Sequence, residues 1–545
     1  MTAGMIRIMT DAATPLFPRE DKRSVRRRST LATAVRLRPV AFLAGAVALA
    51  ASAPLIAVLA SLTQPFGDTI AHVAATTGAA YVTGTLALMV GAGVLATVIG
   101  TGAALAVSLA DFPGRRLFSV ALAAPLAVPA YIAAYAYGDF FGPFGAFAAV
   151  TGVRIDIRNF AGAVFVLTMT LYPYVYLAAR AAFEARSGAY LEAARLAGVA
   201  PLRAAILLLA PSARPAIVGG ALLVMMESAA DFGVADYFGV PTLSVGVFRT
   251  WNAFGDLTAA AQLASLLVLI AIILVTLETF SRRGGADEGA RGQRARRRLR
   301  LRCGPATATV FLCAAPVLVG AVIPIAVIAM KPGSATAMRG LSAALGNSLV
   351  AASAGAALII AAAMLLAYAA RASKGPALGA ALRAATLGYA VPGAVIAIGV
   401  FSAGAFVLGG AVAQATGLAA LLLAYLARFL TAGLNVVSGG LDGVTKAVDG
   451  AARVLGAGGA RIAARIHAPL MAPSLAAAAI ILFVDIAKEL PATLILRAFN
   501  FETLATRVYR LAGDERLAEA APAALTLIGL GVLPVIALGL IGRKN

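Results

Sequence analysis

Four acidic residues stand in two matched pairs inside apolar stretches of the sequence. Glu227 and Asp231 are four positions apart, and so are Asp485 and Glu489, which follow 258 positions later. Residues four apart lie on the same face of a helix, so each pair presents two carboxylates side by side. Carboxylate oxygens suit hard metal cations, but they also form structural ion pairs, for which Lys488 is an adjacent partner. Either chemistry needs helices that hold both pairs away from lipid.

The composition places those helices in a membrane. Of the 545 residues, 61% are hydrophobic and 13% are charged, and the mean hydropathy is +0.91. Soluble domains are about 45–50% apolar and about a quarter charged. A charge at the centre of a bilayer costs at least about 2.5–3.5 kcal/mol, so the acids should face a protein-lined or watery interior. There they line or gate a translocation path, or else they pair with Lys488, with neighbouring helices or with helix N-termini, and the sequence leaves both interpretations open.

Apolar stretches long enough to cross a membrane recur along the whole chain. The sequence predicts an all-α polytopic membrane protein with about twelve transmembrane helices, arranged as two parallel six-helix repeats because each half has an even number of spans. The expected spans are 40–63, 80–110, 117–138, 161–183, 212–232 and 259–280 in the first half, and 305–330, 345–370, 384–410, 415–437, 469–489 and 521–542 in the second.

Weaker echoes support the same repeat outside the acid pairs. Each echo is a short match between equivalent predicted spans. The matched positions are Thr85-Leu86 with Ser348-Leu349, Pro129 with Pro392, and Tyr176 and Arg180 with Tyr425 and Arg428.

Arginine clusters set the expected boundaries and orientation. The net charge is +21, and the clusters lie beside apolar spans, which is typical of cytoplasmic segments. The chain has one Trp and no basic-aromatic interleaving of the kind that nucleic-acid binders show. We predict a cytoplasmic basic tail over 1–38, a first membrane domain over 39–280, an Arg-rich cytoplasmic linker over 281–303 and a second membrane domain over 304–545. Both termini should lie in the cytoplasm.

A short polar sequence occurs once in each half, between the predicted fourth and fifth spans. Its alanines allow close approach of a partner surface, its glycine allows a turn, and its proline should start the next transmembrane helix. The alternative is an ordinary amphipathic surface loop, but two copies at matching places favour a paired docking site. The matching residues are Glu192, Ala193, Ala194, Gly198 and Pro211 in the first copy, and Gly450, Ala451, Ala452, Gly456 and Pro469 in the second.

This pattern resembles the EAA loop of ABC importer permeases, which reads Glu-Ala-Ala, three residues, Gly, nine residues and Ile-x-Leu-Pro. In that family the loop forms a coupling helix that fits a groove on the ATP-binding subunit. The resemblance implies the type I ABC importer permease fold, two copies of a separate ATPase on the cytoplasmic side, and ATPase-coupling roles for the ten residues of the two copies. Two departures stand out: Gly450 replaces the Glu, although Asp449 is adjacent, and Ala replaces the Leu before each Pro.

The sequence around the acids points to a narrower group. Residues 227–251 and 488–507 resemble fused permeases of the ferric-iron importer group, which carry two six-span modules in one chain. The resemblance implies a periplasmic binding protein as a partner, a bacterial inner membrane as the location, and ferric iron as the cargo. Thiamine and aminophosphonate permeases share this layout, so those cargoes and a polyamine are alternatives.

Other function classes fit the sequence poorly. No Gly-Lys dipeptide occurs, so a Walker A loop is absent and ATP hydrolysis is expected in a separate subunit. The spacing of Cys303, Cys313, His72 and His467 predicts no metal site and no disulfide, and no cofactor or catalytic residue is predicted. A secondary transporter of the major-facilitator kind also has six plus six spans, but it does not explain the paired polar segments. A membrane-embedded enzyme would need clustered His, Asp or Ser.

Overall fold

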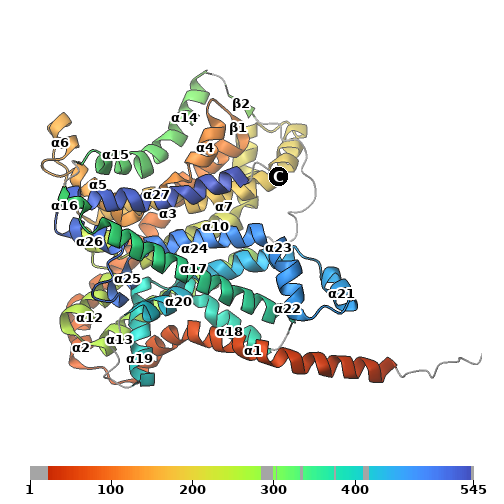
Figure 1. Cartoon of the computed structure of the whole chain (residues 1–545). Helices are drawn as coiled ribbons and strands as arrows, with labels where there is room; N and C mark the ends of the chain where they lie inside the picture. Colours follow the sequence, from red (N-terminus) through yellow and green to blue (C-terminus); the bar gives the residue numbers. More distant parts are fainter. Residues whose placement is uncertain are drawn as a thin grey trace, which may run out of the picture.

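The computed structural model describes residues 22–283, 299–301, 303–331, 335–372, 376–408 and 417–541, and in these ranges it is helical almost throughout (Figure 1). The one strand pair in these ranges joins β1 (Ala110–Asp111) to β2 (Leu299–Arg300) in parallel. This short pairing ties the end of the second predicted span to the start of the second half.

The first half begins with long helices and becomes more broken after α7. Its elements are α1 (Lys22–Ala60), η1 (Ser61–Thr63), α2 (Asp68–Val73), η2 (Ala74–Gly78), α3 (Ala79–Leu109), α4 (Arg115–Ala121), η3 (Ala124–Ala127), α5 (Ala130–Phe140), α6 (Ala146–Thr151), α7 (Phe160–Leu196), α8 (Pro201–Ala204), η4 (Ala205–Leu209), α9 (Ala210–Ser212), α10 (Arg214–Ala230), α11 (Gly233–Tyr237), α12 (Leu243–Phe254) and α13 (Leu257–Arg283).

The second half is also mainly helical. Its described elements are α14 (Cys303–Val317), η5 (Leu318–Val322), α15 (Ile323–Ala329), α16 (Ala335–Met338), α17 (Leu341–Ala372), α18 (Pro376–Thr386), η6 (Leu387–Ala390), α19 (Gly393–Leu408), α20 (Leu418–Asp442), α21 (Lys446–Val454), α22 (Gly459–Ile462), η8 (Ala463–His467), α23 (Ala468–Leu470), α24 (Ala472–Lys488), α25 (Pro491–Leu496), α26 (Leu504–Gly513) and α27 (Leu517–Ile541).

The predicted repeat is clearest in the run of elements that leads to the acids. The run α8, η4, α9 and α10 is followed 258 positions later by α22, η8, α23 and α24, and each element has the same length as its counterpart. One sequence echo becomes a shared contact. The Thr85 hydroxyl accepts a hydrogen bond from the first N–H of α12 at 2.8 Å, and the Ser348 hydroxyl accepts one from the first N–H of α26 at 2.8 Å.

The count of twelve straight spans is not confirmed. In the described ranges seven continuous helices are long and apolar enough to cross a membrane, or nine if two bent pairs each count as one span. The predicted span 117–138 is bent by 89° between Arg115–Ala127 and Ala130–Phe140, where Pro129 lacks the N–H that would continue the helix. The predicted span 469–489 is bent by 70°.

Two other predicted spans are shorter than expected in the described ranges. The span predicted at 212–232 is α10, which has 17 residues. The span predicted at 384–410 contains α19, which has 16 residues, whereas the span predicted at 521–542 overlaps α27, which has 25.

Each half is built on three mutually packed helices, α3, α7 and α10 in the first and α17, α20 and α24 in the second. Glycines allow the close approach in the first half. A Cβ on Gly100 would lie 2.8 Å from the Tyr172 carbonyl oxygen of α7, and one on Gly220 would lie 2.8 Å from the Val175 Cα. These two glycines let α3 and α10 press against the backbone of α7.

The first helix of each half packs against the other half. Helix α1 contacts α19, α18, α20 and α17, while in the first span of the second half α14 contacts α3 and α15 contacts α5. The two halves are therefore interlocked rather than side by side. Figure 1 shows α21, α22 and α23 at one end of the molecule, and α6, α16, α26 and α12 at the other.

Candidate functional site

The acid pairs lie where α10 and α24 end. Helix α10 stops at Ala230 and leaves Asp231 as its C-cap in an extended conformation, and Glu489 occupies the same place after α24. The Asp231 carboxylate accepts hydrogen bonds from the N–H groups of Val234 and Ala235 at 2.9 and 3.2 Å. Glu489 accepts the equivalent bonds from the N–H groups that follow it, at 3.0 and 2.9 Å. Both acids thus cap the N-terminus of the next short helix, α11 or α25.

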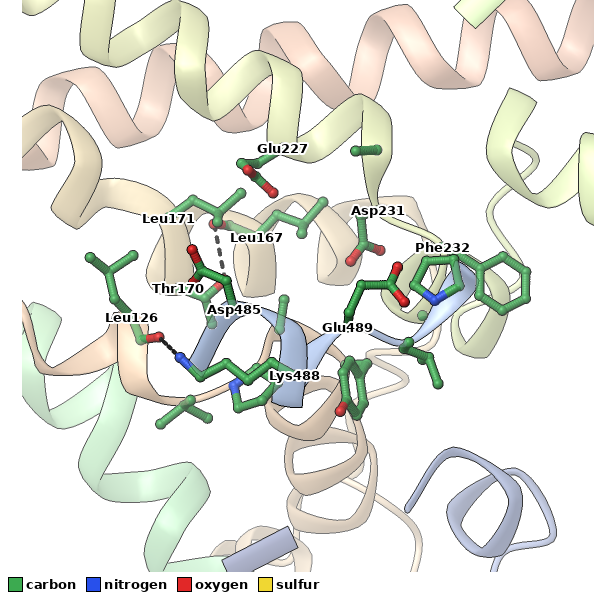
Figure 2. Close-up of a pocket in the computed structure, with 18 of the residues that line it drawn as sticks. Leu126, Leu167, Thr170, Leu171, Glu227, Asp231, Phe232, Asp485, Lys488 and Glu489 are labelled. Carbon is green, nitrogen blue, oxygen red and sulfur yellow. Dashed lines mark hydrogen bonds between the residues drawn. The ribbon is translucent and has the colours of Figure 1, made fainter. Parts of the chain in front are cut away.

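All five candidate path residues line one cavity of about 200 Å³ between the two halves. They are Glu227, Asp231, Asp485, Lys488 and Glu489. The first half contributes α10, α7 and the break between η3 and α5, and the second half contributes α24, α20 and η6. We call this space the central cavity, and Figure 2 shows the four carboxylates turned toward it.

The other two acids have a different environment from the two caps. Within the described residues, neither the Glu227 nor the Asp485 carboxylate accepts a hydrogen bond or forms an ion pair. Both side chains face the central cavity and are half-buried. Asp231 and Glu489 therefore have a structural role as helix caps, whereas the carboxylates of Glu227 and Asp485 are available to a cation.

Two basic side chains share the central cavity with the acids. The Arg428 guanidinium donates to Glu489 at 3.3 Å. The Lys488 ammonium donates to the Leu126 carbonyl oxygen at 2.9 Å, across the boundary between the halves (Figure 2). With all six groups ionised, four carboxylates against two cations leave an excess of two negative charges.

A glycine makes room for the Arg428–Glu489 pair. A Cβ on Gly393 would overlap both Nη1 of Arg428 and Oε1 of Glu489. We expect Gly393→Ala to lower the thermal stability of the detergent-solubilised protein, since overpacking costs about 1–3 kcal/mol. Gly404→Ala in the same helix is the control, because that glycine has open space around it. Equal melting temperatures for the two variants would contradict the prediction.

The two polar segments have the same backbone geometry. Gly198 and Gly456 lie in the left-handed region with φ of 70° and 80°. In the first copy the N–H of Val199 donates to the Ala194 carbonyl at 2.9 Å, and in the second the N–H of Ala457 donates to the Ala452 carbonyl at 2.9 Å. Each glycine therefore ends a helix in the manner that favours Gly.

The structure places the remaining residues of these segments as follows. Ala194 and Ala452 are buried, whereas Gly450 and Ala451 are exposed. Glu192 and Ala193 belong to the backbone of α7, but their side chains lie outside the described part of the structure.

The sequence predicts that the two prolines start the long transmembrane helices, and the structure shows that they do not. Pro211 and Pro469 lie in the three-residue helices α9 and α23, and α10 and α24 begin only at Arg214 and Ala472. A second proline follows at the start of each long helix, and a proline fits only the first turn of a helix. The chain therefore turns once more before it enters α10 or α24.

A polar network that the sequence analysis missed anchors the second segment. Asp449 of α21 accepts a bond from His467 Nε2 at 2.7 Å and one from Arg371 Nε at 3.1 Å. His467 Nδ1 lies 2.9 Å from the Tyr368 hydroxyl, and the two rings are stacked. Arg371 also donates to two carbonyls at the end of α20, at 2.8 Å each. The first half has Leu191 and Leu209 at the positions of Asp449 and His467, so it lacks this network.

The described residues contain no group of three or more His, Cys, Asp or Glu side chains that could hold a metal ion. Cys303 is exposed and Cys313 is buried, and both are free thiols. His467 acts as a hydrogen-bonded member of the anchoring network.

Comparisons with known proteins agree with the architecture. No protein-family model matches this chain. The chain is 24% identical over 463 residues to the Fe(3+)-transport system permease protein FbpB 2 of Haemophilus influenzae, covering 83% of this chain and 88% of the relative. It is 25% identical over 184 residues to the sulfate transport system permease protein CysT of Salmonella typhimurium, covering 32% of this chain and 66% of that relative. The chain is therefore similar to membrane transport permeases, in agreement with its resemblance to ABC importer permeases.

Proposed function

We propose that this chain is the fused permease subunit of an ATP-driven ABC importer, and that it carries ferric iron from a periplasmic binding protein into the cytoplasm. The observation that carries this proposal is the central cavity, where the carboxylates outnumber the basic groups and Glu227 and Asp485 are available. Oxygen ligands suit a hard trivalent cation better than thiolates do. The relative named as an Fe(3+)-transport permease supports the same cargo.

The charge of the central cavity argues against anionic cargo. Sulfate, which appears in the name of the second relative, and an aminophosphonate would meet an excess of negative charge there. Thiamine and a polyamine are cationic and fit the charge balance. Competition for uptake separates these two from ferric iron.

The two polar segments are the proposed docking sites for two copies of a separate ATPase. Each presents an apolar side chain to solvent at the same place, because Leu196 is 92% exposed and Val454, 258 positions later, is 87% exposed. Apolar groups this exposed on an outer turn suit a surface that a partner covers. The binding protein would dock at the opposite end of the molecule, where α12 and α26 lie (Figure 1).

The chain connects each proposed docking segment directly to an acid pair. After Gly198 the chain passes through α8, η4 and α9 into α10, which carries Glu227 and ends at Asp231. After Gly456 the equivalent elements lead into α24, which carries Asp485. Movement of the segments as the ATPases close would therefore shift both acid pairs together and change access to the central cavity.

The proposal includes an orientation and a division of the chain. We place the permease in a bacterial inner membrane with both termini in the cytoplasm, as the Arg-rich segments favour. The tail 1–38 and the linker 281–303 would be cytoplasmic, and the two membrane domains would span 39–280 and 304–545. Residues 1–21 and 284–298 lie outside the described residues.

Uptake of radiolabelled ferric iron by iron-starved cells, with and without this chain, tests the function. An alanine in the left-handed region costs about 1–2 kcal/mol, so Gly198→Ala combined with Gly456→Ala should lower uptake by at least about tenfold. The matched control is Gly114→Ala. This glycine also has positive φ, at 78°, but it precedes α4 and lies outside the docking segments and outside α12 and α26.

Three outcomes are informative. Loss of uptake in the deletion and in the double variant, but not in the control, supports ferric cargo and coupling through the paired segments. Uptake that does not depend on the chain, in cells without another iron system, would contradict ferric cargo. Equal uptake by the double variant and the Gly114→Ala control would contradict the coupling role alone.

A further inference from the structure

Two further cavities lie near the end of the molecule away from α21–α23. Their volumes are about 660 and 490 Å³, and both are lined by Tyr135, Arg158, Tyr237 and Glu515. Residues of α5 and α11 from the first half meet residues around the α26–α27 connection of the second half there. We call these two spaces the outer cavities.

Helix α5 connects the outer cavities to the central cavity through two tyrosines. Tyr131 lines the central cavity, and Tyr135, one turn later on the same face of α5, lines both outer cavities. Their ring centres are 6.1 Å apart, and the ring of Tyr237 follows at 4.6 Å from Tyr135. The tyrosines thus form a continuous row from the outer cavities to the carboxylates.

Neither hydroxyl of this pair has a partner. Tyr131 is 6% exposed and Tyr135 is 1% exposed, yet both hydroxyl oxygens are buried without a hydrogen bond among the described residues. A buried phenol usually finds a partner, because its desolvation is otherwise uncompensated. Phenylalanine would fill the same space at a lower cost in stability, so packing alone does not account for the two hydroxyl groups.

The close packing around Tyr131 holds it in place. A Cβ on Gly233 of α11 would lie 2.5 Å from the Tyr131 Cβ, so the glycine lets α11 approach α5 at this point. Gly233 also lies two positions after Asp231, whose carboxylate caps α11. The helix that holds Tyr131 in position therefore belongs to the same local structure as one of the acids.

We propose that the phenol oxygens of Tyr131 and Tyr135 are cargo ligands, which pass the cation from the outer cavities to the carboxylates of the central cavity. The proposal rests on the proposed ferric cargo. Phenolate and carboxylate oxygens are hard donors, and tyrosine is a known ligand of ferric iron in proteins. When a phenol binds Fe³⁺ its proton leaves to water or to a carboxylate of the central cavity, and it returns when the cation moves on. No change of iron oxidation state is needed.

Single Tyr131→Phe and Tyr135→Phe variants of the full permease test this proposal, because they remove one oxygen and keep the ring. The matched control is Tyr172→Phe, since the Tyr172 hydroxyl is also buried without a partner but Tyr172 lines neither the central nor the outer cavities. All three variants should match or exceed the wild type in melting temperature. Only the first two should lose ferric uptake, by at least about tenfold.

A second readout separates ligation from a loss of shape. The purified permease in nanodiscs, with ferric nitrilotriacetate added, should develop a visible phenolate-to-iron charge-transfer band. The band should weaken in Tyr131→Phe and Tyr135→Phe and persist in Tyr172→Phe. If wild-type cells take up ferric iron and all three variants do so equally, the tyrosine proposal is wrong and the proposed function stands. If the wild type takes up none, both are wrong.

Discussion

The Glu227→Gln and Asp485→Asn double variant should fold normally and lose at least about a hundredfold of ferric uptake, because each carboxylate lost near a trivalent cation removes a large favourable interaction. Neither carboxylate accepts a hydrogen bond from the described residues, so an amide of the same shape breaks no contact. The change also relieves repulsion among four acids around one cavity. Uptake measured at equal membrane expression gives the result.

The two capping acids provide the contrast. Asp231→Asn and Glu489→Gln each weaken a pair of bonds from backbone N–H groups, and Glu489→Gln also breaks the ion pair with Arg428. These variants should lower the melting temperature, since losing a cap costs about 0.5–2 kcal/mol. The double variant of Glu227 and Asp485 should leave the melting temperature unchanged. Normal ferric uptake by that double variant would rule out a path role for both acids.

Part of the central cavity could be predicted from the sequence because it depends on local spacing and on a repeat. The interval of 258 residues is enough to identify Asp485 as the counterpart of Glu227, and the two acids do meet in one cavity. The two acids of each pair do not share one helix, however, since α10 and α24 end just before the second acid of each pair. That acid is a cap, and its partners lie in the following helix.

Other features depend on contacts between distant segments. The break at Val128-Pro129 divides an apolar stretch whose composition suits a straight span. The packing of α1 against α19 is equally hidden, because a helix that is apolar all round does not show which neighbour it will meet. Tyr131 and Tyr135 look like ordinary core residues in the sequence. What sets them apart is a buried hydroxyl without a partner in a residue that also lines a cavity, and both facts come from the structure.

Replacing Asp449 with alanine should destabilise the fold strongly. Arg371 is 13% exposed and would keep its charge without a carboxylate partner, while His467 would lose the acceptor of its Nε2–H. Breaking a buried ion pair by removing one partner costs about 3–5 kcal/mol. The melting temperature in detergent should therefore fall by several degrees, and coupling of ATP hydrolysis to uptake should fall with it because α21 is the second proposed docking segment.

The loss should depend on pH in a definite direction. Burial acts to raise the pKa of the Asp449 carboxyl, but the bond from His467 and the charge of Arg371 outweigh it and hold the pKa below its ordinary value of 3.8. A lowered folded-state pKa stabilises the fold above the unfolded pKa, and this contribution is lost as the pH falls through the folded pKa. Wild type and Asp449→Ala should therefore differ fully at neutral pH and converge below about pH 4.

The first half of the chain supplies the decisive control, because it builds the equivalent segment without this network. Serine and leucines replace the charged and imidazole groups there, at Ser108, Leu191 and Leu209. The triple variant Arg371→Ser, Asp449→Leu and His467→Leu removes every charge at once, and replacing a whole buried polar network with apolar groups is often neutral. It should recover most of the stability that Asp449→Ala loses. If the triple variant recovers stability but not coupling, the network sets the position of α21 and does more than stabilise the fold. The two proposed docking segments would then differ in how they are anchored.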